Sequence, residues 1–377
     1  MKRKNEAKWI VKRKRWQINV QADCVRRTFT SAVEGQKGKD IAESKADAWL
    51  EKHLAGEETR CEILLDSFLE KKKKTTSAVN YRQVEYHVRC YIKPAIGRKR
   101  ISQLTEDDLQ DIIDSAYAIH HLAKKTLENI RGTISTFVKF CRKRKVTALR
   151  LEGLEIPRKA KKSEKHIAQP EDVRTLFQKN QTTYYNKEVF ERCIHAYRFS
   201  LITGIRFGEL IGLEWSDYDP AREIIMIGRA INDMKEESDG KSDNAKRPRS
   251  VKGLARRELD AQRTMLKEEG TESKYIFPDT DGSFFQQKHF RDLWYRYCKH
   301  NGITKITPYE LRHTFVSIND EMPDGLKKQT LGHSANMDTE GVYGHRKAGD
   351  LERIAEIGDA SIQRILDEND ENKEACT

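Results

Sequence analysis

The stretch from Thr307 to His345 constrains this chain more than any other part of its sequence. Its three short motifs, in order, are Tyr309-Glu310-Leu311-Arg312-His313-Thr314, Leu331-Gly332-His333 and Val342-Tyr343-Gly344-His345. They provide a guanidinium, an imidazole and a phenol within one short length of chain. A phenol is a poor nucleophile at neutral pH unless its charge is stabilised as it develops. Arginine and histidine can stabilise that charge and also bind phosphate, so the motifs indicate chemistry on a phosphate group.

A second motif lies upstream and reads Thr203-Gly204-Ile205-Arg206-Phe207-Gly208-Glu209-Leu210. Arg206 comes just after a Thr-Gly pair that is typical of a helix end. A buried helix that delivers an arginine at its end costs free energy unless an anion receives the charge. Glu209 is placed to hold the guanidinium. Considered without the downstream motifs, Arg206 fits a simple Arg–Glu ion pair equally well.

Both motifs, in this order, resemble the signatures of the tyrosine recombinase (phage integrase) family. The family carries T-G-x-R-x-G-E-L, then H-x-x-R-H-T, then L-G-H, and a Tyr shortly afterwards. The resemblance covers roughly residues 165 to 350. It implies that Arg206 and Arg312 clamp the scissile phosphate and that His333 donates a hydrogen bond to it. Tyr343 is then the nucleophile, and leaves a 3′-phosphotyrosine.

The sequence departs from the family at Tyr309, where a His is usual. A tyrosine can hydrogen-bond a phosphate oxygen, but it cannot act as an imidazole base at neutral pH. His313 is expected to be a buried supporting residue rather than a replacement for that His. His345 is likewise expected to be structural.

The resemblance also implies a catalytic lysine in the turn of a β-hairpin, with a spelling close to K-[TN]-x-x-[SA]-x-R. The segment Lys241 to Arg247 fits that spacing, with Ser242 in place of Thr or Asn. Lys246 is the alternative, since Arg249-Ser250-Val251 fits the start of the next strand. The lysine would protonate the leaving 5′-oxygen as general acid. A surface lysine in a charged loop is the competing interpretation.

The charge of the chain favours a nucleic-acid partner. Its 377 residues carry a formal net charge of +12, and 34% of them are charged. A basic surface of this kind suits a polyanion, whereas solubility alone is the weaker explanation because the basic residues are clustered. The clusters are Lys2-Arg3-Lys4, Lys12 to Arg15, Lys71 to Lys74, Arg142 to Lys145 and Arg158 to Lys162.

The sequence gives no sign of a membrane, a disulfide framework or a cofactor. It has no run of eighteen apolar residues, and its basic N-terminus lacks the apolar segment of a signal peptide. The seven cysteines are scattered without a C-x-x-C pair, as expected for reduced thiols in the cytoplasm and no zinc site. No ATP-binding G-x-x-x-x-G-K-[ST] loop and no metal-ligand spacing occur, so neither cofactor nor metal is expected.

Residues 1 to 56 are predicted to form a small α+β domain. Lys8 to Arg13, Trp16 to Gln21 and Val25 to Thr30 have the mixed pattern of half-buried strands, and a helical pattern runs from Ile41 to Leu50. This domain resembles the arm-binding domain of phage and conjugative-transposon integrases, and so implies DNA binding. A charged solvent face on an ordinary sheet is the alternative.

Residues 57 to 156 are predicted to be all-α, with Thr105 as the N-cap of one helix and a last helix from Ala123 to Arg144. They resemble the core-binding domain of the family. Thr75, Thr76 and the lysines Lys71 to Lys74 are candidate phosphate contacts or a solvated face. Residues 157 to 167 form a basic linker, whose composition argues against a packed element; in the family this linker lies along the DNA.

Residues 168 to 377 are predicted to form the mixed, mainly-α (α+β) catalytic domain of this multidomain chain. A helix is expected after Gln169, an apolar helix from Phe190 to Thr203, and a strand from Glu223 to Ile227. A short amphipathic helix after Gly349 ends the domain. In the family that segment packs onto a neighbouring protomer, and packing on its own domain is the alternative.

The sequence therefore predicts a site-specific DNA recombinase, an integrase that integrates and excises a mobile element through a 3′-phosphotyrosine. Its expected partners are double-stranded DNA at the element ends and the target, other protomers in a tetramer, and an excision factor. Two alternatives remain: a type IB-like topoisomerase that shares the mechanism, and a non-catalytic DNA-binding protein with the same fold.

Overall fold

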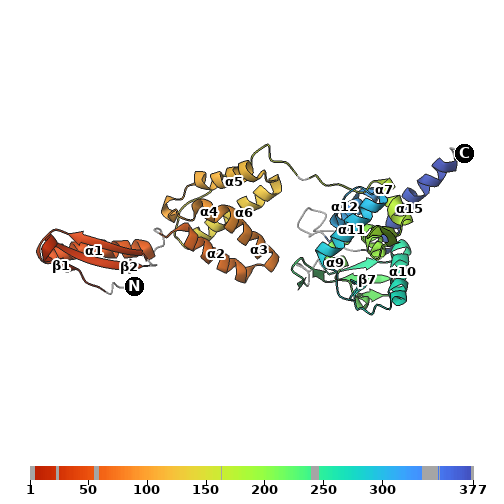
Figure 1. Ribbon diagram of the computed structural model, residues 1–377, viewed down its shortest axis with the longest axis horizontal. Helices are drawn as coiled ribbons and strands as arrows, with labels where there is room; N and C mark the ends of the chain where they lie inside the picture. The colour runs from red at the N-terminus through yellow and green to blue at the C-terminus, as the bar shows by residue number, and fades with distance from the viewer. Residues whose placement is uncertain are drawn as a thin grey trace. The chain divides into compact units, whose positions relative to one another are not determined.

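A computed structural model of the protein describes residues 5–22, 25–54, 59–162, 164–238, 246–332, 347 and 349–374 (Figure 1). The chain divides into two compact units, Met1–Ser163 and Glu164–Thr377. The first unit contains a small sheet with one helix and a separate group of helices. The second is mixed and mainly helical. This is the multidomain class predicted from the sequence.

The N-terminal sheet has three antiparallel strands in the order β1 (Lys8–Ile10), β2 (Arg15–Ala22) and β3 (Val25–Ser31). Helix α1 (Gly35–Leu54) lies along it (Figure 1). Ile18 and Val20 are buried against Ala42, Ala46 and Trp49 of that helix. The alternating pattern of β2 therefore marks the face that α1 covers.

The first predicted strand is too long. It was expected to run from Lys8 to Arg13, but β1 ends at Ile10 and a single 3₁₀ turn, η1 (Val11–Arg13), follows. Lys14 then adopts a left-handed conformation with φ of 43°. The turn is needed because Ile10 pairs directly with Arg15 in the antiparallel register.

The helical part of the first unit is built around one apolar core. Its elements are α2 (Cys61–Thr75), α3 (Ala78–His87), a π-helical turn η2 (Val88–Ile92), α4 (Lys93–Ile96), η3 (Ile101–Gln103), α5 (Glu106–His120) and α6 (Lys124–Lys143). Thr105 and Asp108 form the capping box that opens α5, as the sequence predicts. Phe68 of α2 packs edge-on against Phe137 and Phe140 of α6, at 5.8 and 5.5 Å between ring centroids.

The segment after α6 packs more closely than its basic composition suggests. Leu154 and Ala160 are buried in the helical core, and Lys124 donates its backbone N–H to the carbonyl oxygen of Lys161 at 2.9 Å. Ala160 is small enough to be buried between charged neighbours whose side chains remain in solvent. The expectation that Pro157 to Ser163 would not pack is therefore wrong as far as Lys161.

The second unit is mixed, as expected. Its helices are α7 (Pro170–Gln178), α8 (Ile194–Thr203), α9 (Phe207–Leu210), η4 (Trp215–Asp217), α10 (Gly253–Glu269), α11 (Gln287–Asn301), α12 (Pro308–Ile318), α13 (Asp324–Leu331) and α15 (Asp350–Glu374). Its strands are β4 (Gln181–Tyr184), β5 (Lys187–Phe190), β6 (Tyr218–Asp219), β7 (Ile224–Ile227), β8 (Ala230–Ile231), β9 (Glu237–Ser238) and β10 (Arg247–Ser250). The antiparallel sheet β10-β7-β6 and two hairpins, β4-β5 and β8-β9, account for these strands.

The helix predicted from Phe190 begins later. Residues Lys187–Phe190 form β5, which pairs with β4, and α8 starts at Ile194. Tyr185 and Asn186 have φ of 47° and 59°, the conformation of a tight hairpin turn. The apolar residues Val189 and Phe190 thus extend a hairpin rather than the helix, and both are exposed.

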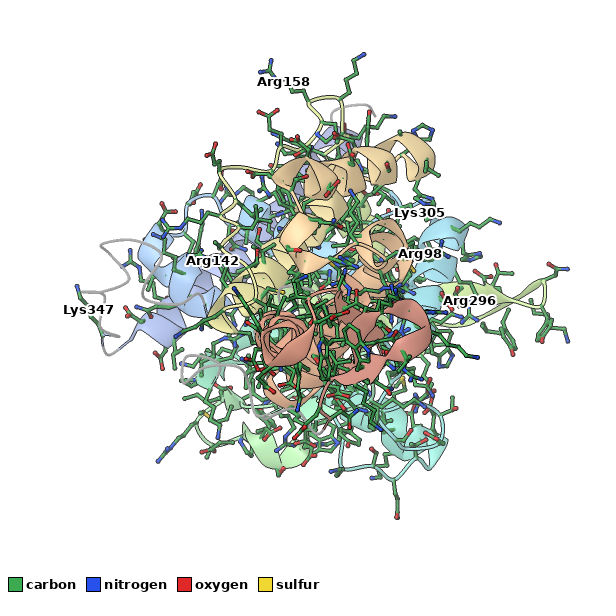
Figure 2. The ribbon with its side chains drawn as sticks, turned by 90° about the vertical axis from the view of Figure 1, so that its left-hand side faces the viewer. Arg98, Arg142, Arg158, Arg296, Lys305 and Lys347 are labelled. Carbon is green, nitrogen blue, oxygen red and sulfur yellow. The ribbon has the colours of Figure 1, made fainter. Side chains whose placement is uncertain are left out.

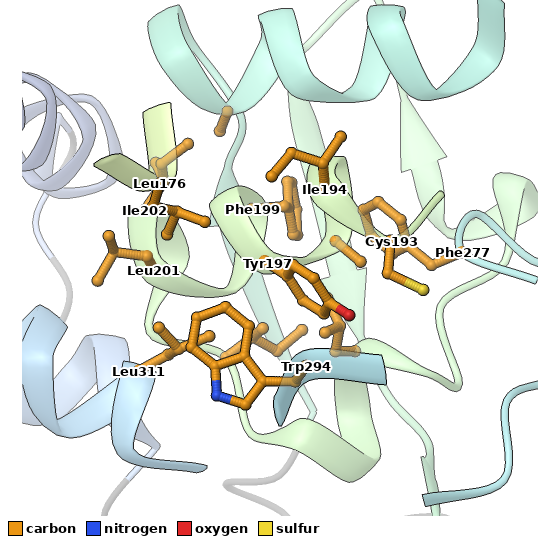
Figure 3. Packing of buried hydrophobic residues seen from close by; sticks show 14 of the residues in the cluster. Leu176, Cys193, Ile194, Tyr197, Phe199, Leu201, Ile202, Phe277, Trp294 and Leu311 are labelled. Atoms are coloured by element: carbon orange, nitrogen blue, oxygen red, sulfur yellow. The ribbon is translucent and has the colours of Figure 1, made fainter. Parts of the chain in front are cut away.

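Helix α8 is the centre of the second core. All of its residues except His195 are buried, and Tyr197 lies 4.7 Å from the ring of Trp294 (Figure 3). The helix ends at Gly204, whose φ of +60° favours glycine. A Cβ at this position would lie 2.5 Å from Cδ1 of Phe315. The chain that leads to Arg206 is therefore fixed by close packing.

Helix α15 packs on its own domain. Ile362 and Ile365 belong to the core around α8, and Arg174 of α7 donates to the carbonyl oxygen of Ile365 at 3.0 Å. The helix is longer than the short stretch expected from the sequence, because it continues through charged residues to Glu374. The packing of Ile362 and Ile365 is thus in cis. Among the described helices, none combines the length and apolar composition that a membrane span requires.

Candidate active site

Arg206 and Glu209 form the first part of the site, at the start of α9. The carboxylate of Glu209 accepts the backbone N–H of Arg206 at 3.0 Å and its Nη1 at 2.9 Å. The arginine side chain is 36% exposed and the glutamate side chain 6%. Burial alone raises the pKa of Glu209, but hydrogen bonds and charges from Arg247 and Arg206 outweigh it and hold that pKa below its usual value. Glu209 is therefore a carboxylate anchor for a partly exposed guanidinium.

Arg247 of β10 is buried and binds the same carboxylate. Its Nη1 and Nη2 donate to the two oxygens of Glu209 at 3.0 and 2.8 Å, and its Nε donates to the carbonyl oxygen of Thr330 at 3.2 Å. The side chain is 2% exposed. Glu209 is thus shared between two arginines on different elements.

Arg312 of α12 is the second predicted clamp residue, and it is buried. Its Nη1 donates to the carbonyl oxygen of Gly204 at 2.8 Å, and its Nη2 to that of Leu331 at 2.6 Å. Burial, followed by the charge of Arg206, lowers the pKa of Arg312 to about 10. The guanidinium is held by the carbonyl ends of two helices, which carry partial negative charge.

Arg249, two residues after Arg247, is a fourth buried guanidinium. It donates to the carbonyl oxygen of Thr203 and lies over the ring of Phe315, 5.3 Å from its centroid. Burial, then the charges of Arg247 and Arg312, lowers the pKa of Arg249 to about 9. Four arginines therefore gather around the carboxylate of Glu209, and the excess positive charge favours binding of an anion.

The two β10 arginines were missed as site residues. In the sequence Arg247 is the last residue of the lysine motif, and Arg249 fits the start of the next strand. That strand starts at Arg247 and pairs with β7, whose Ile225 and Ile227 are buried. Alternation along a strand puts residues two apart on one face, so the pattern Arg-Pro-Arg opposite a buried strand was the available signal.

Tyr309 lies one helical turn before Arg312 and is 49% exposed. Its ring meets His313 edge-on, with 5.2 Å between ring centroids. Burial, followed by the charge of Lys165, lowers the pKa of His313. Tyr309 thus has its phenol on the surface, and His313 is the partly buried partner of its ring.

Three of the six predicted site residues, Lys241, His333 and Tyr343, fall outside the described residues. Gly332, which precedes His333 in the chain, has φ of +60° and accepts Nη2 of Arg206 through its carbonyl oxygen at 3.2 Å. Lys246, the alternative lysine, is exposed at the edge of β10. The structure therefore brings together Arg206, Arg312 and the residue before His333.

A second basic region lies in the helical part of the first unit. A cavity of about 560 Å³ between α2 and α6 is lined by basic residues, threonines and two phenylalanines. The basic residues are Lys71, Lys72, Lys139, Arg142 (labelled in Figure 2) and Lys143.

Within the described ranges, no group of three His, Cys, Asp or Glu side chains is placed to hold a metal ion.

Comparison with known proteins gives two family matches and a relative of known name. Residues 168–349 match the model of the phage integrase family, and residues 62–117 match that of the phage integrase N-terminal SAM-like domain. The ICEBs1 integrase of Bacillus subtilis (strain 168) is 27% identical over 161 residues, which are 40% of this chain and 44% of that protein. The match thus spans less than half the length of this relative.

Solved structures share the fold at low sequence identity. The Tn1549 transposon integrase in complex with transposon right end DNA superposes with a TM-score of 0.59 and 17% identity, over 78% of this chain and 98% of that one. The lambda integrase tetramer bound to a Holliday junction gives 0.57 and 12%, over 90% and 94%. These structures show a shared fold. The two phage integrase models, with the ordered motifs around Arg206 and Arg312, establish that the chain belongs to the phage integrase family of tyrosine recombinases.

Proposed function

We propose that the chain is a site-specific DNA recombinase, an integrase that cuts and rejoins DNA to integrate and excise a mobile element. The observation that carries the proposal is the cluster of Arg206, Arg247, Arg249 and Arg312 around Glu209. Arg206 is the member whose guanidinium is most exposed, and Arg312 lies buried behind it. An excess of positive charge beneath one exposed arginine suits a phosphodiester that approaches from solvent.

The proposed chemistry is attack of the Tyr343 phenol oxygen on the scissile phosphorus. The new P–O bond forms as the bond from phosphorus to the 5′-oxygen breaks, and it leaves a 3′-phosphotyrosine. The phenol proton of Tyr343 passes to water, and the departing 5′-oxygen takes a proton from Lys241. Arg206, Arg312 and His333 stabilise the charge that builds on the non-bridging oxygens, and Tyr309 donates a further hydrogen bond. The bond energy is kept in the phosphotyrosine, so the reverse reaction with a second strand rejoins the DNA without ATP.

The proposed partners are double-stranded DNA at the element ends and the target, and further copies of this chain. The lambda integrase structure contains a tetramer on a Holliday junction, and we extend that assembly to this chain. An excision factor is a further proposed partner. The domain boundaries 56/57 and 167/168 and the arm-binding and core-binding roles belong to the same proposal. The helical domain then extends past residue 156 to Lys161, which packs with it. The lysines of the α2–α6 cavity are proposed phosphate contacts.

The test is covalent capture of DNA by the full chain. A binding site is first selected from random duplex DNA, and nicks are then placed at successive positions so that the cleaved fragment diffuses away. A denaturing gel should resolve a protein–DNA band attached at the 3′-phosphate end. If no nick position yields such a band while binding persists, the chain is a non-catalytic DNA-binding protein.

A second assay distinguishes the two enzymatic interpretations, an integrase and a type IB-like topoisomerase. Two labelled duplexes that carry the selected site are incubated with the protein, and a supercoiled plasmid without the site is incubated in parallel. An integrase should exchange strands between the duplexes. Relaxation of the plasmid without strand exchange would instead identify a type IB-like topoisomerase.

A further inference from the structure

We propose that Arg247 is a positioning residue for strand cleavage: it takes up part of the charge of Glu209, so that Arg206 keeps positive charge for the scissile phosphate. The inference rests on the proposed function. Arg247 does not itself belong to the residues that touch DNA, since its side chain is 2% exposed against 36% for Arg206. Any influence on the phosphate must therefore pass through its neighbours.

The first of these neighbours is the Glu209 carboxylate. Arg247 binds it with both terminal nitrogens, at 3.0 and 2.8 Å, whereas Arg206 binds it with one, at 2.9 Å. A two-bonded guanidinium–carboxylate contact in a buried site is the stronger interaction. The negative charge of Glu209 is therefore drawn toward Arg247, and Arg206 is oriented by the glutamate without being neutralised by it.

The second neighbour is the end of α13. The Nε of Arg247 donates to the carbonyl oxygen of Thr330 at 3.2 Å. Gly332 lies close to the same side chain: a Cβ added to Gly332 would be 3.1 Å from Nη1 and 3.2 Å from Cζ of Arg247. The carbonyl of Gly332 in turn accepts Nη2 of Arg206. Arg247 thus supports Arg206 from two sides, through Glu209 and through the turn that precedes His333.

Removal of Arg247 would change the charge at the clamp. Glu209 would then pair with Arg206 alone, and the two side chains together would be neutral. The consequence should be specific to a substrate that carries negative charge on its non-bridging oxygens. A residue that merely fills the core would instead weaken the fold whatever the charge of the substrate.

The test compares capture rates on two nicked duplexes that differ at the scissile position. One has the natural phosphate, and the other has a methylphosphonate, in which a methyl group replaces one non-bridging oxygen and removes the negative charge. For Arg247→Met, we expect capture on the phosphate to fall about 100-fold relative to wild type, as small misplacements in active sites typically cause. On the methylphosphonate the same variant should react at close to the wild-type rate for that substrate.

Arg198→Met is the matched control. Arg198 is also a buried arginine of the second unit, but its guanidinium donates to the carbonyl oxygens of Leu176 and Lys179 and to Asn180. Its loss should lower the melting temperature and slow both substrates by the same factor. If Arg247→Met also slows both substrates equally, or slows neither, the positioning role is overturned.

Two further measurements keep the result interpretable. If Arg247→Met does not bind the selected site, Arg247→Lys takes its place, since a lysine keeps the charge but cannot span both oxygens of Glu209 and the carbonyl of Thr330. It should show a smaller loss on the phosphate and the same relief on the methylphosphonate. If the wild-type chain captures no DNA, the proposed function itself is contradicted. If the wild-type chain captures DNA and both Arg247 variants slow capture of the two substrates equally, only the role of Arg247 is contradicted.

Discussion

Arg312 donates a 2.6 Å hydrogen bond to the carbonyl oxygen of Leu331, the last residue of α13. The other terminal nitrogen of the same guanidinium reaches Gly204, 108 residues earlier in the chain. One buried side chain thus joins the ends of α8 and α13, the two elements from which Arg206 and His333 follow in sequence. This arginine therefore connects the motif that contains Arg206 with the motif that contains His333. Its two hydrogen bonds set the distance between the ends of α8 and α13.

Replacement of Arg312 by lysine should keep the charge and lose the connection, because a lysine cannot donate to both carbonyl groups in this geometry. We expect covalent capture to fall by about 100- to 1,000-fold, the typical cost of one misplaced donor to a developing oxyanion, with DNA binding nearly unchanged. The capture rate on the nicked duplex measures it. Arg192→Lys is the control, because Arg192 also joins two groups with its guanidinium, the carboxylate of Glu269 and the carbonyl oxygen of Pro278. If Arg312→Lys captures DNA at the wild-type rate, phosphate binding does not depend on the two hydrogen bonds of the guanidinium.

Gly204→Ala should destabilise the second unit for two separable reasons. The left-handed conformation at φ +60° costs an alanine about 1 to 2 kcal/mol. The new Cβ would also lie 2.5 Å from Phe315, and displacement of a packed ring costs about 1 to 3 kcal/mol more. Gly302→Ala isolates the first term, since Gly302 caps α11 at φ +72° with no atom within 4 Å. Calorimetry of the full chain should show a larger decrease in melting temperature for Gly204→Ala than for Gly302→Ala. Equal decreases would rule out the steric contribution of Phe315.

The sequence was informative where local chemistry decides the structure. The Thr105 N-cap and the strand β7 are set by neighbouring residues. Both are confirmed, with β7 beginning at Ile224, one residue later than expected. The β4–β5 hairpin was not foreseen, because its turn depends on positive φ at Tyr185 and Asn186, and tyrosine is not a residue type that marks such a turn.

The burial of Arg247 and Arg249 was beyond local reasoning for a different reason. Arginine in a charged segment is usually solvated, and these two are buried only because Glu209 and the carbonyl groups of Thr203 and Thr330 receive them. Those partners lie far away in the chain. The pairing of β10 with β7 is what brings the two guanidiniums inward.

The affinity for DNA should depend strongly on salt, and the α2–α6 cavity should account for part of that dependence. Each phosphate contact that is removed lowers the slope of log K against log salt by about 1. Lys139→Ala changes a lysine that lines the cavity, and Lys267→Ala changes an exposed lysine in the last turn of α10. Binding measured from low to physiological salt should give a reduced slope for Lys139→Ala alone. Equal slopes in both variants and wild type would remove the cavity from the DNA interface.

Lys241→Ala should slow cleavage and leave DNA binding nearly intact, because the proposed role of Lys241 is proton donation to the leaving oxygen. A general acid typically contributes about 100- to 10,000-fold. Lys246→Ala is the matched control, since Lys246 is exposed beside β10 and is the alternative in the same motif. A substrate whose leaving 5′-oxygen is replaced by sulfur needs no general acid, because a thiolate leaves readily, and should restore cleavage by Lys241→Ala. If Lys246→Ala shows the loss and the rescue, the catalytic lysine is Lys246.

The last prediction concerns the nucleophile. Tyr343→Phe removes one oxygen atom, so the fold and DNA binding should persist while the covalent band on a denaturing gel disappears. Tyr309→Phe is its natural counterpart, because Tyr309 also presents a phenol, 49% exposed, one helical turn from Arg312. Loss of its hydrogen bond to the phosphate should slow capture by about 10-fold, roughly the value of one net hydrogen bond, and leave the band itself intact. Protease digestion of the captured complex should then place the DNA on the peptide that contains Tyr343. A band that survives in Tyr343→Phe and vanishes in Tyr309→Phe would make Tyr309 the attacking residue.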